Sequence, residues 1–430
     1  MNTTEARTER SELIEGKVRD NRGEAKSSVS SVKLIKQNKQ GLKVLIASVI
    51  LQFFLGIIYT WSVFKAPVSV YYKWDAFDVG LTASFMLCFF AVGILLGGKI
   101  LAKIGVKLTV LIGGLMVATG MLATSFIPAT GATSVFWIYF LYGIIGGSGV
   151  GAAYNAIISN AQKWFPENRG FATGVSVSAF GFSTVFFAPF IKMLSENLEV
   201  NVIFMILSAI FAVTTLLTFS FIKSPDQTTN ASIPVLKGKQ YTNGEMLKTT
   251  RFYLITLSMM FGTSVFFTIN PDLKDLAINR NAASFATILV MVLGISNALG
   301  RLCVPLLSDK IGAINTNILI LAATALGAFL LCFVGGIGLI ITISIVAFCY
   351  GGTAGLYPVI TADNFGLKNV ASNYGLVMIG FMLSALIFPF LIGKIDNQSM
   401  KFITLGIIAV ISTIFVVILK IMRKKSRDSE

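Results

Sequence analysis

The sequence predicts an all-α membrane protein of twelve transmembrane helices, arranged as two six-helix halves. Of 430 residues, 55% are hydrophobic and only 13% are charged, and the mean hydropathy is +0.78. From Gly41 onward, apolar runs follow one another at the length of about 20 residues that a helix needs to cross a bilayer. A soluble enzyme does not have this composition.

The apolar runs define the expected helices in chain order. Each is long enough to span a hydrocarbon core about 30 Å thick, and a polar stretch divides them into two sets of six. The expected spans are 42–64, 79–98, 108–127, 134–159, 171–194 and 200–222 in the first half, and 252–271, 282–307, 316–334, 337–362, 374–395 and 402–422 in the second.

Polar segments flank and separate these halves, which gives five expected regions. Residues 1–41 mix basic and acidic side chains and form a polar tail, without the apolar core of a cleaved signal peptide. Residues 42–222 and 251–422 form the two halves. Residues 223–250 have the composition of a linker, and 423–430 form a short basic tail.

The basic residues gather in loops on one side of the predicted helices, which explains the net charge of +15. By the positive-inside rule this side is cytoplasmic, and it holds both termini and the linker. The same residues form no basic stripe with interleaved aromatic residues, so nucleic acid is not an expected partner. The short loops and the absence of a targeting presequence indicate a bacterial cytoplasmic membrane.

Several kinds of chemistry are excluded by what the chain contains. It has no histidine, and its four cysteines, Cys88, Cys303, Cys332 and Cys349, are scattered without metal-binding spacing. No nucleophile with an adjacent base can be identified. We therefore expect no metal, no cofactor and no enzymatic activity.

An internal repeat of about two hundred residues relates the halves, a pattern typical of transporters. Residues 98–105, which include Ala102 and Gly105, align position for position with 305–312. Weaker matches join Gly146-Gly147 to Gly351-Gly352 and 163–170 to 364–368. Repeats of this kind rock about a site at their shared midplane, so the repeat predicts alternating access.

Arg301 lies inside the apolar span 282–307. Counted back eight residues from Asp309 at the polar end of the span, it is roughly 12 Å deep in a core about 30 Å thick. An unpaired cation at this depth costs from about 2.5 to more than 10 kcal/mol, so it is kept where it faces a protein interior or a watery cavity. The alternative is that Arg301 snorkels to the nearby surface or braces helix ends through Asp309.

The loop motif at 308–312, with Asp309 and Lys310, resembles the short loop motif of the major facilitator superfamily, and the resemblance extends from Gly41 to Ile421. The leading glycine of that motif is Pro305 here, and its first-half acid is Ala102. The resemblance implies the fold of that superfamily and a gating latch at Asp309 and Lys310, while Ala102 puts the first-half latch in doubt.

More narrowly, the chain is similar to the oxalate/formate antiporter family and its monocarboxylate-transporting relatives. The matching stretches are 56–64, 163–170, 296–301 and 351–358. In that family the arginine at the position of Arg301 holds the substrate carboxylate, and aromatic residues from other helices close the pocket. By this resemblance the binding residues include Tyr59, Tyr154, Tyr357 and Phe180.

Two positions depart from the oxalate exchangers. Thr353 stands where a larger side chain is expected, and Ser384 stands where the exchangers carry a lysine for the second carboxylate. Two carboxylates would then face one cation, and the uncompensated desolvation argues against a dianion. Ser384 is therefore predicted to line a site for a monoanion.

The residues themselves favour the same substrate class. A guanidinium offers a planar fork to a carboxylate, and no acidic residue lies deep in any predicted span to receive a cation. Asn297 is one helical turn from Arg301, so it could hydrogen-bond a hydroxyl or keto oxygen, or instead bond another helix. The tyrosines could donate hydroxyl groups or only pack.

Energy coupling is left open by the sequence. The acidic candidates Asp272, Asp275 and Asp363 lie near helix ends, and relatives often have an aspartate where Asn297 stands. We expect symport of protons with a small 2-oxo or 2-hydroxy monocarboxylate, carried across the lipid bilayer by a monomer. Exchange of anions is the first alternative, and a membrane sensor that binds carboxylates without transport is the second.

Overall fold

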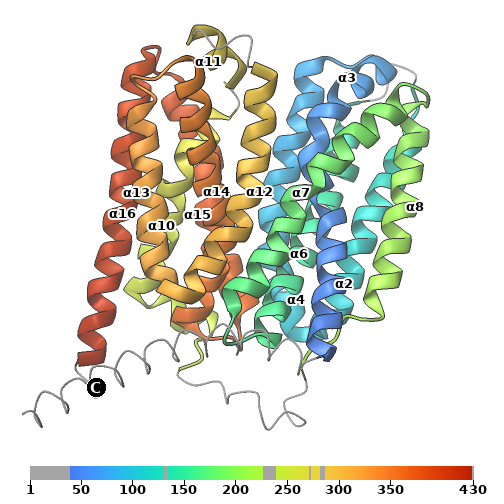
Figure 1. Ribbon diagram of the computed structural model, residues 1–430. Coiled ribbons are helices and arrows are strands. Elements are labelled where there is room, and N and C mark those ends of the chain that lie inside the picture. Colours follow the sequence, from blue (N-terminus) through green and yellow to red (C-terminus); the bar gives the residue numbers. More distant parts are fainter. Residues whose placement is uncertain (1–38, 130–133, 226–238, 271–272, 281–285, 429–430) are drawn as a thin grey trace, which may run out of the picture.

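The computed structural model describes residues 39–129, 134–225, 239–270, 273–280 and 286–428 (Figure 1). All regular elements in these ranges are helices. Most of the predicted N-terminal tail, the centre of the linker, the start of the span predicted at 282–307, and Asp272 lie outside the described residues.

The helices form two bundles that stand side by side (Figure 1). The first half of the chain contains α2 (Lys39–Leu55), η1 (Gly56–Thr60), α3 (Trp61–Tyr72), α4 (Ala76–Ser125), α5 (Phe136–Ile138), η2 (Tyr139–Gly146), α6 (Gly147–Trp164), α7 (Arg169–Ser195) and α8 (Val200–Phe219). The second half contains α9 (Asn243–Leu247), α10 (Thr250–Ile269), α11 (Leu273–Asn279), α12 (Ala286–Ile311), α13 (Ala313–Leu330), α14 (Gly336–Phe365), α15 (Val370–Gly393) and α16 (Gln398–Asp428).

Eleven helical stretches in the described residues are long and apolar enough to cross a membrane, and one of them supplies two crossings. α4 has 50 residues, about 75 Å of helix, which is more than twice the thickness of the hydrocarbon core. Gly105, with φ 79° and ψ 170°, breaks it between the spans predicted at 79–98 and 108–127. The twelve expected crossings are thereby accounted for.

The internal repeat is visible in the backbone. Gly312 separates α12 from α13 with φ 85° and ψ 144°, close to the conformation of Gly105. A positive φ strains any residue with a Cβ atom, so both repeats need glycine where the chain turns back. The sequence match of 98–105 with 305–312 thus marks two copies of one turn.

Two short helices and one extension were not predicted. α9 lies within the linker, where Thr242 and Glu245 form a capping box whose hydrogen bonds hold the pKa of the Glu245 carboxyl below its usual value. α11 follows α10. The last helix continues to Asp428, so residues predicted as a tail extend α16, because a helix does not have to end where the apolar run ends.

The halves meet through α7 against α12 and through α4 against α15, at the end of the molecule where the linker lies, here called the linker end (Figure 1). Glycines allow this approach. A Cβ atom on Gly98 would lie 2.5 Å from the Ala371 carbonyl oxygen, and one on Gly174 would lie 2.9 Å from the Leu302 oxygen. The helix backbones therefore pack in direct contact.

Charged groups hold the first of these interfaces together. The Asp309 carboxylate accepts hydrogen bonds from the backbone N–H groups of Gly170 (2.8 Å) and Phe171 (2.7 Å) at the start of α7. Arg169, one residue earlier, forms an ion pair with Asp363 of α14 at 3.1 Å. A carboxylate at a helix N-terminus is favoured by the exposed N–H groups and by the helix dipole.

The second interface uses a neutral group. Asn155 of α6 donates both amide hydrogens, one to the Ile94 oxygen of α4 and one to the Ala371 oxygen of α15, each at 2.8 Å. Ala102 stands at the position that repeats Asp309, so no carboxylate is available there. The Lys310 side chain is exposed and makes no hydrogen bond or ion pair within the described residues.

The glycine contacts within a half predict a pair of contrasting substitutions in α12. A Cβ atom on Gly300 would lie 1.9 Å from the Phe348 oxygen of α14, whereas one on Gly294 would meet nothing within 4 Å. We expect Gly300→Ala to destabilise the fold by about 1–3 kcal/mol, because the added methyl group overpacks the contact. Gly294→Ala should be neutral or stabilising, because alanine favours a helix by about 1 kcal/mol.

The measurement is the apparent melting temperature of each variant in detergent, with size-exclusion chromatography as a check of monodispersity. Equal melting temperatures for the two variants would contradict the close backbone packing of α12 on α14.

Candidate functional site

Arg301 lies near the middle of the molecule, facing the other half. It is ten residues from Ile311, the last residue of α12, which corresponds to about 15 Å along the helix. Its relative exposure is 2%, and among the residues that the structure describes it is the only charged one that is buried. The interpretation that Arg301 snorkels to a surface is therefore not supported by its position.

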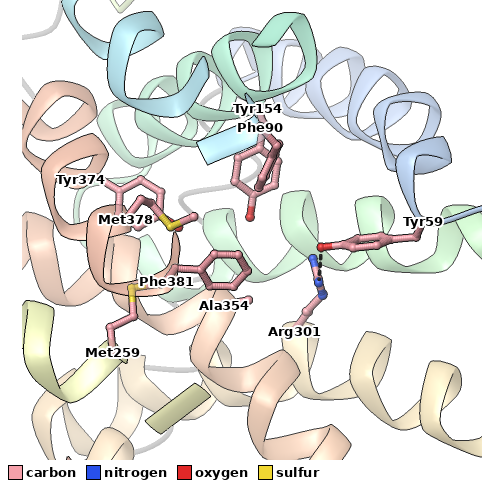
Figure 2. Close-up of a pocket in the computed structure, with 9 residues that line it drawn as sticks. All are labelled: Tyr59, Phe90, Tyr154, Met259, Arg301, Ala354, Tyr374, Met378 and Phe381. Atoms are coloured by element: carbon pink, nitrogen blue, oxygen red, sulfur yellow. Dashed lines mark hydrogen bonds between the residues drawn. The ribbon is translucent and has the colours of Figure 1, made fainter. Parts of the chain in front are cut away.

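Two neutral side chains hold the guanidinium. Arg301 Nε donates to Asn297 Oδ1 at 2.9 Å. Arg301 Nη2 donates to the Tyr59 hydroxyl at 3.2 Å, the bond drawn in Figure 2. Asn297 lies one turn earlier on the same helix, while Tyr59 belongs to the other half. No described carboxylate pairs with Arg301, so the guanidinium keeps the capacity to bind an anion.

Aromatic faces surround the cation on the side of the first half. The Arg301 Cζ atom lies 5.4 Å from the Tyr59 ring centroid and 5.8 Å from that of Phe180. Phe180 in turn contacts the rings of Tyr59 and Tyr154, with centroids 5.5 and 4.9 Å away. Ring faces carry negative charge density, so they stabilise a desolvated cation without neutralising it.

Glycine brings these rings into place. A Cβ atom on Gly181 of α7 would lie 3.0 Å from Arg301 Cδ, and one on Gly56 would lie 2.1 Å from the Phe180 oxygen. Gly56 begins η1, a short 3₁₀ segment that interrupts the first crossing and carries Tyr59. A tighter turn within a membrane helix often marks a functional position.

A small cavity adjoins Arg301 between the two halves (Figure 2). Its open space of about 10 Å³ is close to that of a single water molecule, so a carboxylic acid can enter only if lining side chains move. The cavity is lined by Tyr59, Phe90, Tyr154, Met259, Arg301, Ala354, Tyr374, Met378 and Phe381.

The structure brings most of the predicted site residues together. Arg301, Tyr59 and Tyr154 line the cavity, and Phe180 and Asn297 contact Arg301 from behind. Asn297 was expected to face the substrate or to bond another helix. Its Oδ1 instead accepts from Arg301, so its first role in this structure is to orient the guanidinium.

Tyr357 and Ser384 lie elsewhere. The Tyr357 hydroxyl bonds with Ser258 Oγ at 2.9 Å and accepts from Asn317 at 3.4 Å, within the second half. Ser384 is fully buried, does not line the cavity, and its hydroxyl has no hydrogen-bond partner among the described residues. The structure provides no contact that supports either residue as a substrate ligand, and both assignments stay predictions.

Six lining residues were not expected from the sequence: Phe90, Met259, Ala354, Tyr374, Met378 and Phe381. A signal was present for the last three. Tyr374, Met378 and Phe381 are spaced by four and three residues, which places them on one face of α15. Ser384 continues this row by a further turn, past the end of the cavity.

The acidic candidates for proton coupling do not reach the cavity. Asp363 pairs with Arg169 at the linker end, and the side chains of Asp272 and Asp275 lie outside the described residues. Among the residues that the structure describes, no group of three or more histidine, cysteine or acidic residues could hold a metal ion. The chemistry that the described cavity offers is hydrogen bonding and charge pairing to an anion.

The chain matches the family model described as Major Facilitator Superfamily over residues 44–389. It is 27% identical to the uncharacterized MFS-type transporter YhjX of Escherichia coli, over 80% of this chain and 85% of that one. It is also 27% identical to the oxalate:formate antiporter of Oxalobacter formigenes, covering 74% and 76%, and 25% identical to monocarboxylate transporter 13 of Rattus norvegicus, covering 82% of each.

Among solved structures, the fold is similar to that of the fucose:proton symporter of Escherichia coli. The TM-score is 0.66 and the identity 15%, over 87% of this chain and 98% of that one. At this identity the similarity concerns the fold alone.

The contact between Tyr59 and Arg301 predicts a measurable loss of anion affinity. Tyr59→Phe removes the hydroxyl beside the guanidinium, and a hydrogen bond to a charged group contributes about 1.5–3 kcal/mol. We expect the dissociation constant of a small carboxylate to rise roughly 10- to 100-fold, measured by equilibrium binding to purified protein. Tyr72→Phe is the control, because that hydroxyl bonds the Thr124 oxygen away from the cavity, and an equal loss there would contradict the assignment.

Proposed function

The chain belongs to the major facilitator superfamily, and we propose that within this superfamily it is a secondary transporter of small monocarboxylates, with Arg301 as the ligand of the substrate carboxylate. The observation that carries the proposal is the buried guanidinium, which has neutral partners and adjoins a cavity between the halves. Burial of an ion is most favourable when an opposite charge joins it.

The number of charges in the cavity supports a monoanion. Among the described residues that line it, Arg301 is the only charged one, so one carboxylate is balanced and a second is not. The hydroxyl groups of Tyr59 and Tyr154 add neutral donors on the opposite side. The names of two relatives, an oxalate:formate antiporter and a monocarboxylate transporter, are consistent with a carboxylate substrate.

The location of the cavity supports transport by alternating access. Arg301 belongs to the second half, whereas Tyr59 and Tyr154 belong to the first, so a bound anion would bridge the halves. Contacts between Asp309 and α7, and between Arg169 and Asp363, join the halves at the linker end. Opening that end requires these contacts to break while the substrate remains between the halves.

Coupling to protons is the finer part of the proposal. No described carboxylate lines the cavity, so a proton would travel with the substrate acid or on a group farther away. The same observation favours anion exchange as a second candidate function, because exchange needs no proton site: one carboxylate leaves Arg301 and another replaces it.

We expect purified protein in liposomes to accumulate labelled pyruvate or lactate when the outside is more acidic than the inside. Arg301→Ala should lower the initial rate at least 100-fold, because it removes a charged hydrogen-bonding partner worth about 3 kcal/mol. Arg301→Lys keeps the charge but loses the planar fork and the bond to Asn297, so a loss of at least tenfold is expected.

The control is a proton ionophore. It should abolish accumulation of the labelled acid above its outside concentration, while the acid still equilibrates across the membrane. Uptake only into liposomes preloaded with a carboxylate would identify an exchanger, and unchanged uptake by the Arg301→Ala variant would refute the proposed site.

The ion pair at the linker end predicts a charge-swap result. Arg169→Asp or Asp363→Arg alone should place like charges across the interface and so separate the halves at the linker end. The reporter is a cysteine introduced at Ser178 in a background without the native cysteines. Each single substitution should raise the reactivity of this cysteine toward a thiol reagent added at the linker end. The double swap should restore low reactivity, because the pair re-forms. Equal reactivity in all four proteins would mean that this pair does not hold the halves together.

A further inference from the structure

The cavity beside Arg301 has two chemically different sides. Arg301, Tyr59, Tyr154 and Tyr374 provide a cation and three hydroxyl groups. Met259, Ala354, Met378 and Phe381 provide hydrocarbon and thioether sulfur. These four side chains offer no strong hydrogen-bond donor or acceptor, so a ligand bound at Arg301 must place an apolar group against them.

Phe381 is the rigid member of this apolar side. Its ring contacts Phe267 edge-on, with centroids 4.9 Å apart, and lies 6.5 Å from the Tyr350 ring. Tyr350 stacks on Phe266 at 3.6 Å, so Phe381 is supported from behind by an aromatic cluster of α10 and α14. In Figure 2 the ring projects into the space between Met378 and the guanidinium.

The methionines of the same wall are adaptable. Met259 and Met378 have flexible side chains that can adopt other rotamers within a packed site. The phenyl ring of Phe381 is rigid and supported by its neighbours, so it cannot change shape to make room for a ligand. Because the cavity holds only about the volume of one water molecule, a ligand gains room first from the methionines and meets a fixed limit at Phe381.

We propose that Phe381 determines which monocarboxylates are accepted, by limiting the tail to a short and apolar group packed against its ring. This inference rests on the proposed function, since it takes the carboxylate to lie at Arg301. It excludes acids with a second carboxylate or a terminal hydroxyl, because the apolar wall cannot replace the water around those groups.

The inference is tested by competition against uptake of a labelled monocarboxylate. Straight-chain acids from acetate to octanoate, together with malonate and succinate, are compared as inhibitors of wild type, Phe381→Ala, Phe381→Leu and Phe388→Ala. Phe388 is the matched control: it lies two turns farther along α15, is 6% exposed, and contacts Phe261 without lining the cavity.

For wild type we expect inhibition to weaken sharply beyond a certain chain length, and the dicarboxylates to inhibit poorly. Phe381→Ala should lower the half-inhibitory concentration of the longer acids at least tenfold, with changes below threefold for acetate and propionate. Phe381→Leu should move the limit by one or two methylene groups. Phe388→Ala should keep the wild-type profile.

Other outcomes overturn the inference in distinguishable ways. If uptake depends on Arg301 but every variant keeps the wild-type profile, Phe381 does not set tail length, although the proposed function stands. The leucine variant decides this if the alanine variant fails to fold. Strong inhibition of wild type by the dicarboxylates would refute the apolar wall, and uptake independent of Arg301 would refute the proposed function together with the orientation of the tail.

Discussion

The constraint on which the site depends is the burial of the Arg301 charge without a carboxylate partner among the described residues. Taking an ion out of water costs several kcal/mol even after relaxation, so the neighbours of the guanidinium must offset part of this cost. Asn297 and Tyr59 supply oxygen acceptors, and Tyr59 and Phe180 supply ring faces. None of them cancels the charge, which is why the position can serve an anion that comes and goes.

Meeting that constraint imposes demands on segments far from Arg301 in sequence. The rings that face the guanidinium come from η1 and α7, so the first half must approach α12 closely. Gly181 permits this at Arg301 itself, and Gly56 allows η1 to lie against α7. The same use of glycine recurs at Gly98, where α4 meets α15. Close backbone packing in a membrane depends on such small residues, since lipid provides no hydrophobic force between helices.

The sequence was sufficient to predict the number of crossings, the repeat, and Arg301 as the central charge, because hydropathy, repeated glycines and a lone cation are properties of single segments. It was less informative about what surrounds Arg301. Tyr357 belongs to the stretch that resembles carboxylate carriers, yet its hydroxyl bonds Ser258. Phe381 shares a helical spacing with Tyr374 and Met378, but this spacing does not indicate that their face of α15 lines a cavity. Which face of α15 meets α10 and α4 depends on the packing of several helices, and that information is distributed along the whole chain.

The two interfaces between the halves are built differently, although the repeat relates them. At α7 and α12 the closure uses charge, with Asp309 at a helix N-terminus and Arg169 paired with Asp363. At α4 and α15, where Ala102 replaces the acid, the polar link between the halves is the buried amide of Asn155. Asn155 follows Tyr154, which lines the cavity. Neighbouring residues of a helix cannot move independently, so a displacement of α6 at the cavity also acts on the bond from Asn155 to α15. Both interfaces are thus mechanically tied to the site, because Asp309 shares α12 with Arg301 in the same way as Asn155 shares α6 with Tyr154.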